Sequence, residues 1–206
     1  PAAAVEDIHR VHSVEFVEEV QRASSGSPSA RARRFGLNTP DVPVFNGMDE
    51  AARKLSGGTL HAGKMVASGE SRRVLQLGGG LHHAHFALAS GFCVYNDLSV
   101  AIGSLRESRL KVAYVDIDVH HGDGVQQLHY VDPDVMTISL HESGQYLFPG
   151  TGHVHELGEG PGKGYKLNVP LEPYTQHDSY LESFERVVPH ALSWFHPDVL
   201  LVQCGS

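Results

Sequence analysis

The sequence predicts an α/β protein with a mostly parallel central sheet and helices on both faces. Two observations carry this prediction: short runs rich in Val, Ile and Leu alternate with longer amphipathic segments, and most of these runs are apolar throughout. Strands that are apolar on both faces are typical of a parallel sheet covered by helices. The 206 residues are 41% hydrophobic, enough for one substantial core. We therefore expect residues 1–206 to belong to a single domain.

The first part of the chain predicts helices. Ser13 is a favourable N-cap for a helix over 13–24, where apolar residues recur at helical spacing. Residues 24–46 are rich in Ser, Gly, Pro and Arg without periodicity, and so predict a surface loop. A second helix is expected over 48–68, although its interior Ser-Gly-Gly lowers helix propensity.

Strands and helices alternate in the remainder of the chain. We expect strands at 73–77, 111–117, 135–140 and 198–204, and helices at 96–105, 123–131 and 177–195. Binding loops of such sheets follow the carboxyl ends of the strands. Three polar segments, 78–97, 118–124 and 141–153, each follow an expected strand, which predicts that the functional site lies there.

Composition disfavours several classes of function. The chain has 24 acidic and 16 basic residues, a formal net charge of −8 and no basic stripe, so direct binding of nucleic acid is not expected. No apolar run is long enough to span a membrane and no signal peptide is evident, which predicts a soluble cytoplasmic protein. Cys93 and Cys204 are too few for a disulfide framework, as in a reducing compartment. The sequence does not indicate the oligomeric state.

Acidic and histidine residues crowd together where the apolar run before Asp116 ends. Carboxylates this close repel one another unless a cation or a proton lies among them. Asp118 and His120 are one residue apart and can face the same point, and a carboxylate with an imidazole suits Zn²⁺, Fe²⁺ or Mn²⁺. A third ligand must come from elsewhere in the fold. His82 and His83 are candidates for general acid and base, with Asp116 and Asp123 available to orient them.

Four segments carry a specific resemblance. "GGGLHHAHFALASGFCVYND", "VDIDVHHGDGVQQLHY", "TISLHESGQYLFPGTG" and "VLLVQCGS" resemble consecutive signatures of the zinc-dependent histone deacetylase family, in order and spacing, from about residue 35 onward. Among its members, the chain resembles the bacterial acetoin-utilisation type most. The resemblance implies an arginase-like α/β fold and hydrolysis of the amide of an acetylated lysine or a small acetylated amine, with Zn²⁺ or Fe²⁺ as catalytic metal and K⁺ as structural ion.

The resemblance also implies roles for particular residues. Asp118 and His120 resemble two zinc ligands, His83 the general base for zinc-bound water and His82 its electrostatic partner. Asp123 would orient His83, and Asp116 would orient His82. The remaining implied positions are the substrate-binding Asp41, Gly91, Phe92 and Phe148, and the potassium ligands Asp116, Asp118, Ser139 and the carbonyls of His120 and Leu140.

Measured against that family, the chain is expected to be a fragment truncated at both ends. The family's third zinc ligand, an aspartate, is expected immediately after Ser206, its catalytic tyrosine further on, and its first segment before Pro1. We therefore expect the isolated fragment to be inactive.

Two other functions remain open. One is a manganese ureohydrolase of the same fold, although "DVHHGDG" lacks the further bridging carboxylate such a site needs. The other is a noncatalytic acyl-lysine-binding module. Seven histidines outside the motifs are expected to be surface or capping residues: His129, His141, His153, His155, His177, His190 and His196.

Overall fold

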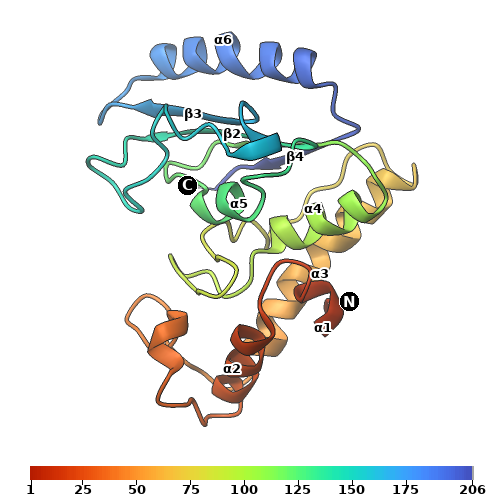
Figure 1. The fold of residues 1–206 in the computed structure, drawn as a ribbon, viewed down its shortest axis with the longest axis vertical. Coiled ribbons are helices and arrows are strands. Elements are labelled where there is room, and N and C mark those ends of the chain that lie inside the picture. The colour runs from red at the N-terminus through yellow and green to blue at the C-terminus, as the bar shows by residue number, and fades with distance from the viewer. Residues whose placement is uncertain (206) are drawn as a thin grey trace. The chain divides into compact units, whose positions relative to one another are not determined.

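The computed structural model describes residues 1–205. They form two compact units, one from Pro1 to Glu107 and one from Ser108 onward (Figure 1). Within the described residues, no helix is both long enough and apolar enough to cross a membrane.

The first unit is helical. Its helices are α1 (Val5–Ile8), α2 (Val14–Ser24), α3 (Met48–Ala67) and α4 (Asp97–Glu107), with a 3₁₀ turn at Ala32–Phe35. Ser13 caps α2 by accepting a hydrogen bond from the Phe16 amide at 3.2 Å. The apolar stripes of α2 and α4 turn inward, so that Phe16, Val20 and Ile102 are fully buried. The predictions for 13–24, 48–68 and 96–105 are confirmed to within two residues at each end, and α1 was not predicted.

The second unit is a parallel sheet with helices. In chain order its elements are β1 (Val112–Asp116), α5 (Asp123–Leu128), β2 (Val135–Glu142), a 3₁₀ turn (Gly160–Gly162), β3 (Lys166–Leu171), α6 (His177–Phe195) and β4 (Val199–Gln203). The sheet order is β3-β2-β1-β4, and all three pairings are parallel. Helix α6 covers one face and α5 lies on the other side (Figure 1). This is the predicted parallel α/β class.

The register brings distant parts of the chain together. Asp116, the last residue of β1, is the Cα partner of Ser139 in β2 and of Gln203 in β4. The apolar core beneath α6 includes Val115 and Ile138 on the strands and Phe195 on the helix. The carboxyl ends of β1, β2 and β4 therefore lie at one edge of the sheet, where the loops after β1 and β2 begin.

The predicted strand at 73–77 is wrong. These residues adopt no regular secondary structure, and Leu75 and Leu77 are 81% and 88% exposed. A strand needs a neighbour to satisfy its backbone groups and an apolar layer to cover its side chains, and no strand within residues 1–205 pairs with this run. The apolar run was therefore a poor predictor of local structure here.

Strand β3 was not predicted, because its sequence does not read as apolar. It begins with Lys166, which is fully buried, with its Nζ donating to the Val135 carbonyl at 2.6 Å and the Asp132 carbonyl at 3.1 Å. Burial lowers the pKa of this lysine to about 8. Pro170 is tolerated because β3 is an edge strand.

Candidate functional site

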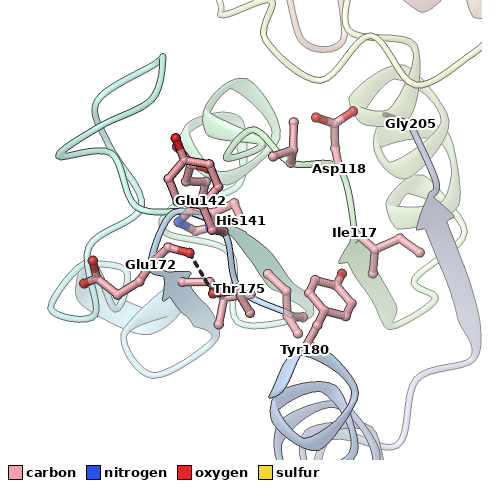
Figure 2. Close-up of a pocket in the computed structure, with 12 residues that line it drawn as sticks. Ile117, Asp118, His141, Glu142, Glu172, Thr175, Tyr180 and Gly205 are labelled. Carbon is pink, nitrogen blue, oxygen red and sulfur yellow. Dashed lines mark hydrogen bonds between the residues drawn. The ribbon is translucent and has the colours of Figure 1, made fainter. Parts of the chain in front are cut away.

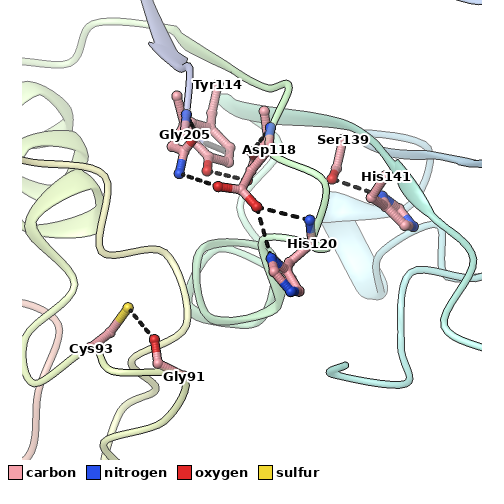
Figure 3. Close-up of polar contacts among 10 residues, drawn as sticks. Gly91, Cys93, Tyr114, Asp118, His120, Ser139, His141 and Gly205 are labelled. Atoms are coloured by element: carbon pink, nitrogen blue, oxygen red, sulfur yellow. Dashed lines mark hydrogen bonds and ion pairs between the residues drawn. The ribbon is translucent and has the colours of Figure 1, made fainter. Parts of the chain in front are cut away.

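The loop after β1 holds a carboxylate and an imidazole side by side. The Asp118 amide donates to Asp116 Oδ1 at 3.0 Å, and the His120 amide donates to Asp118 Oδ1 at 2.8 Å (Figure 3). His120 Nδ1 lies 3.1 Å from the same Asp118 oxygen. These bonds within the loop turn both side chains toward one point, as the one-residue spacing predicts.

The other oxygen of Asp118 faces the end of β4. Gln203 Nε2 donates to Asp118 Oδ2 at 3.2 Å, and a methyl group on Gly205 would overlap that oxygen. Asp118 is only 7% exposed. A segment 85 residues further along the chain thus fixes this carboxylate from its second side.

Asp116 is fully buried beneath this pair. It accepts a hydrogen bond from the Tyr114 hydroxyl, and a Cβ on Gly122 would overlap its carboxylate. Ser139 is its partner across the β1–β2 ladder. Asp123 begins α5 and accepts from the Gly124 amide at 2.9 Å.

Two buried histidines connect the strand ends to the loop that contains Phe148. His141 Nε2 lies 3.0 Å from the Gly152 carbonyl, which only accepts, so this nitrogen donates and Nδ1 accepts from the Ser139 hydroxyl at 2.8 Å. By the same reasoning His121 Nε2 donates to Gln126 Oε1, and Nδ1 accepts from Thr151. Burial lowers the pKa of His141 to about 4 and also lowers that of His121. Both are therefore neutral and act as fixed hydrogen-bond bridges.

The expectation that His141 is a surface or capping residue is wrong, because it lies within β2 and is 1% exposed. His129 is 6% exposed but stands at the C-cap of α5, in line with the capping alternative. In the case of His141 the signal was available, since it continues the apolar strand into the polar segment 141–153. The other five histidines of that set are partly or fully exposed.

A cavity of about 280 Å³ opens beside Asp118 in the sheet unit (Figure 2). Its lining includes Asp118, His141, Glu142, Glu172 and Tyr180. Tyr180 points into this space, and its buried hydroxyl has no hydrogen-bond partner among the described residues. Burial raises the pKa of Tyr180.

His82 and His83 lie in the helical unit and are 3% and 5% exposed. Their rings are adjacent, with centroids 4.0 Å apart. Gly91 packs against His83 so closely that a Cβ there would overlap the imidazole, and its φ of +49° suits glycine. The loop that holds these histidines does not follow a strand, contrary to the expectation that all three polar segments do so.

The proposed substrate-binding residues differ in their surroundings. Phe92 is 77% exposed, and the Gly91 carbonyl accepts a hydrogen bond from the Cys93 thiol at 3.2 Å. Asp41 lies in an exposed turn in which the Val42 amide donates to the Thr39 hydroxyl. In the sheet unit, the Phe148 ring lies 6.3 Å from the His120 ring. One aromatic side chain thus stands beside the Asp118–His120 pair.

The donor chemistry of Asp118 and His120 fits part of a zinc site. The carboxylate oxygen of Asp118 and the imidazole nitrogen of His120 lie 3.1 Å apart. A zinc ion bound by both atoms could take the place of this direct contact. Within residues 1–205, no group of three or more His, Cys, Asp or Glu side chains is arranged to hold a metal ion. The described residues therefore offer a two-ligand pair, and a complete site needs a further ligand.

Comparison with known proteins is unambiguous about the family. A family model described as "Histone deacetylase domain" matches residues 1–206. The acetoin utilization protein AcuC of Bacillus subtilis is 46% identical over 99% of this chain, and the histone deacetylase clr6 of Schizosaccharomyces pombe is 39% identical over 97% of it. These alignments cover 53% and 50% of the two relatives, so the chain spans about half their length.

Solved structures agree in fold. The crystal structure of an HDAC homolog from Aquifex aeolicus matches 98% of this chain with a TM-score of 0.92 at 32% sequence identity, and 55% of that chain is covered. A crystal structure of an HDAC homolog complexed with SAHA matches equally well, at 33% identity.

Proposed function

The chain belongs to the histone deacetylase family, and on that premise we propose that it supplies the water-activating and part of the metal-binding apparatus of a zinc-dependent deacetylase. The proposed substrate is an acetylated lysine side chain or a small acetylated amine, and the products are the free amine and acetate. The observation that carries the proposal is the buried Asp118, set beside His120 at the carboxyl end of β1.

Asp118 and His120 are the proposed metal ligands. When bound, Zn²⁺, or Fe²⁺ in its place, supplies Lewis acidity that polarises the amide carbonyl of the substrate. Asp118 is already fixed by the His120 amide and Gln203, so its carboxylate is oriented before any ion arrives. A third ligand from the longer protein completes the set in this proposal.

His83 is the proposed general base. It takes a proton from the water that attacks the acetyl carbonyl and then delivers that proton to the amine nitrogen as the C–N bond breaks. The ring of His82 lies beside it, with the two ring planes tilted by 53°, and is proposed to stabilise the charge that His83 gains. Asp123 and Asp116 are proposed to orient His83 and His82, respectively. General-base assistance of this kind contributes about 10²- to 10⁴-fold to the rate.

Four residues are proposed to bind the substrate. Phe92 and Phe148 would flank the aliphatic stem of the acetylated amine, and the Gly91 carbonyl would accept its amide N–H. Asp41 would hold the backbone of a peptide substrate. Two contacts support this proposal: Phe148 lies beside the proposed metal ligand His120, and Gly91 packs against the proposed general base His83.

We further propose a structural K⁺ held by Asp116, Asp118, Ser139 and the carbonyls of His120 and Leu140. Asp116 and Ser139 are register partners, which supports this proposal. The Ser139 hydroxyl donates its proton to His141, so its oxygen lone pairs remain as acceptors for a cation. A monovalent ion would also offset the repulsion between the two carboxylates.

Residues 1–206 are proposed to be part of one deacetylase domain, because the family model runs through both compact units. A cytoplasmic location and the absence of direct nucleic-acid binding stay predictions from the sequence.

The decisive experiment uses the complete protein encoded by the gene that contains this sequence. Asp118→Ala should lose the metal, whereas His83→Ala should keep it and lose at least about 10² in turnover of an acetyl-lysine peptide. Asp178→Ala makes the same chemical change as Asp118→Ala on the exposed start of α6, and it should keep both properties. Metal content and activity are measured on the same samples.

The outcomes separate the three candidate functions. Metal lost in both variants would show that the roles are wrongly assigned. Zinc bound with no hydrolysis of any acetylated amine would support a noncatalytic binding module. Activity that requires two Mn²⁺ per chain would support a ureohydrolase.

A further inference from the structure

We propose that Asn96 is a positioning residue that holds the loop containing His82 and His83 in its working shape. The proposal rests on the proposed function of those two histidines and concerns a residue that does not itself touch the substrate.

The side chain of Asn96 reaches both sides of the histidine pair. Its Nδ2 donates to the carbonyl of His82 at 3.3 Å and to the carbonyl of Ala84 at 2.9 Å. Asn96 is fully buried, so these bonds do not compete with water. The backbone on each side of His83 is thereby held by one amide group.

The same side chain caps helix α4. Asn96 Oδ1 accepts from the Ser99 amide at 2.9 Å, three residues into the helix start. Both N–H groups and the carbonyl of the side chain are therefore in use. An aspartate would keep the cap but place a carboxylate oxygen against two carbonyl oxygens, and so only asparagine satisfies all three partners without repulsion.

His12 secures the next carbonyl of the loop. Its Nε2 accepts from the backbone N–H of Asn96 at 2.9 Å, so the ring proton lies on Nδ1, which donates to the His85 carbonyl at 2.8 Å. His12 is 1% exposed. The carbonyls of three loop residues, 82, 84 and 85, are thus tied to the Asn96–His12 pair.

Asp97 fixes the other end of the loop. Its carboxylate accepts from the Gly80 amide and from the Leu81 amide, the latter at 2.7 Å. The loop therefore has anchors before, within and after the histidine pair, and the central anchor is Asn96. A general base displaced by about 1 Å can lose on the order of 10² in rate, which gives this bracing a catalytic consequence.

The test compares Asn96→Ser with Val100→Ala in the complete protein. Serine keeps an N-cap oxygen for α4 but removes both bonds to the loop, whereas Val100 is fully buried on the same helix and offers the loop no side-chain hydrogen bond. Asn96→Ser is expected to lower kcat at least tenfold with KM within twofold of wild type and zinc content unchanged. The side-chain ¹⁵N signals of the His82 and His83 rings should shift or broaden. Val100→Ala should lose stability without either change.

A second variant, His12→Phe, keeps the proposal testable if Asn96→Ser does not fold. His12→Phe keeps an aromatic ring beside Phe16 and Tyr95 but removes the bonds to Asn96 and His85, and it should lower kcat in the same direction. Wild-type kcat and unmoved imidazole signals in Asn96→Ser would overturn the inference. If the wild-type protein hydrolyses no acetylated amine while the imidazole signals still move, the proposed function has failed and the bracing of the loop has not.

Discussion

Different interactions position the two loops that contain the candidate metal-binding and catalytic residues. The Asp118–His120 loop continues a central strand, so the β-ladder on both sides of β1 fixes where it starts and bonds within the loop shape the rest. The loop containing His82 and His83 follows an irregular segment and depends on buried side chains from α4 and the chain before α2. A sheet edge positions a loop through many shared backbone bonds, whereas the second loop depends on a few side chains. A single substitution should therefore cost more stability when it removes a side chain that holds the loop with His82 and His83 than when it removes a side-chain hydrogen bond in the sheet unit.

The largest effect is expected for Asp97→Ala. Alanine leaves the amides of Gly80 and Leu81 and the hydroxyl of Thr59 without their acceptor, and each donor left unsatisfied away from water costs about 1–3 kcal/mol. We expect a loss of about 3 kcal/mol or more in the free energy of unfolding, measured by urea denaturation. Asp198→Ala in the sheet unit removes a single exposed bond to the Lys111 amide and should cost about 1 kcal/mol. Equal losses in the two variants would contradict the comparison.

His12 should make the stability of the protein depend on pH. Burial lowers its pKa to about 4, below the 6.5 of an exposed imidazole, so the unfolded chain binds the proton more tightly. Above about pH 6.5 the ring is neutral in both the folded and the unfolded chain, so burying it costs no protonation free energy. As the pH falls from 6.5 toward 4, only the unfolded chain gains the proton, and the free energy of unfolding decreases. At 1.36 kcal/mol per pH unit, the total loss is up to about 3 kcal/mol.

The His12→Phe variant tests this pH dependence. Its stability should be lower than wild type at pH 7.5, because two hydrogen bonds are lost, and the difference should shrink toward pH 4. The readout is the denaturant midpoint across that range. His9 and His85, whose electrostatic interactions with His12 help to lower its pKa, are present in both proteins. Parallel stability curves would show that His12 does not titrate as described.

In the sheet unit, Gly205→Ala should weaken metal binding. The added methyl group would overlap Asp118 Oδ2 and push the carboxylate away from His120. Disturbing the surroundings of a ligand typically costs about 10- to 100-fold in affinity, and this is the expected loss of Zn²⁺ affinity in a chelator competition. Gly63→Ala makes the same change where the new Cβ meets only ordinary van der Waals contacts, the nearest at 3.8 Å, and should bind Zn²⁺ like wild type. Unchanged affinity in Gly205→Ala would remove Asp118 from the ligand set.

The smallest effect is expected for Arg186→Ala. Arg186 pairs with Glu182 one turn away on α6, and both side chains are mostly exposed. Such pairs contribute about 0.3–0.5 kcal/mol, and salt screens them. The free energy of unfolding, measured by thermal denaturation, should fall by no more than that amount. A larger loss of stability would mean that this ion pair, and not only the apolar side of α6, contributes to the packing of the helix on the sheet.

Sequence patterns alone determined the class of fold and the chemistry of the sheet-edge loop. Apolar patterns report burial, so the runs at 111–117, 135–140 and 198–204 predicted β1, β2 and β4, and every helix except α1 was predicted from its spacing and caps. The Asp-X-His spacing predicted that Asp118 and His120 would lie together, because neighbours on a short turn cannot separate.

Tertiary structure decided what pairs with what. The run at 73–77 is as apolar as a strand but has no partner in residues 1–205, whereas β3, with its Lys, Asn and Pro, forms because β2 offers it a ladder and carbonyls for Lys166. The roles of Asn96, His12 and Gln203 depend on contacts between residues 12 to 85 positions apart in the chain. Local sequence preference is silent about such contacts, since only the folded chain brings the donor to its acceptor.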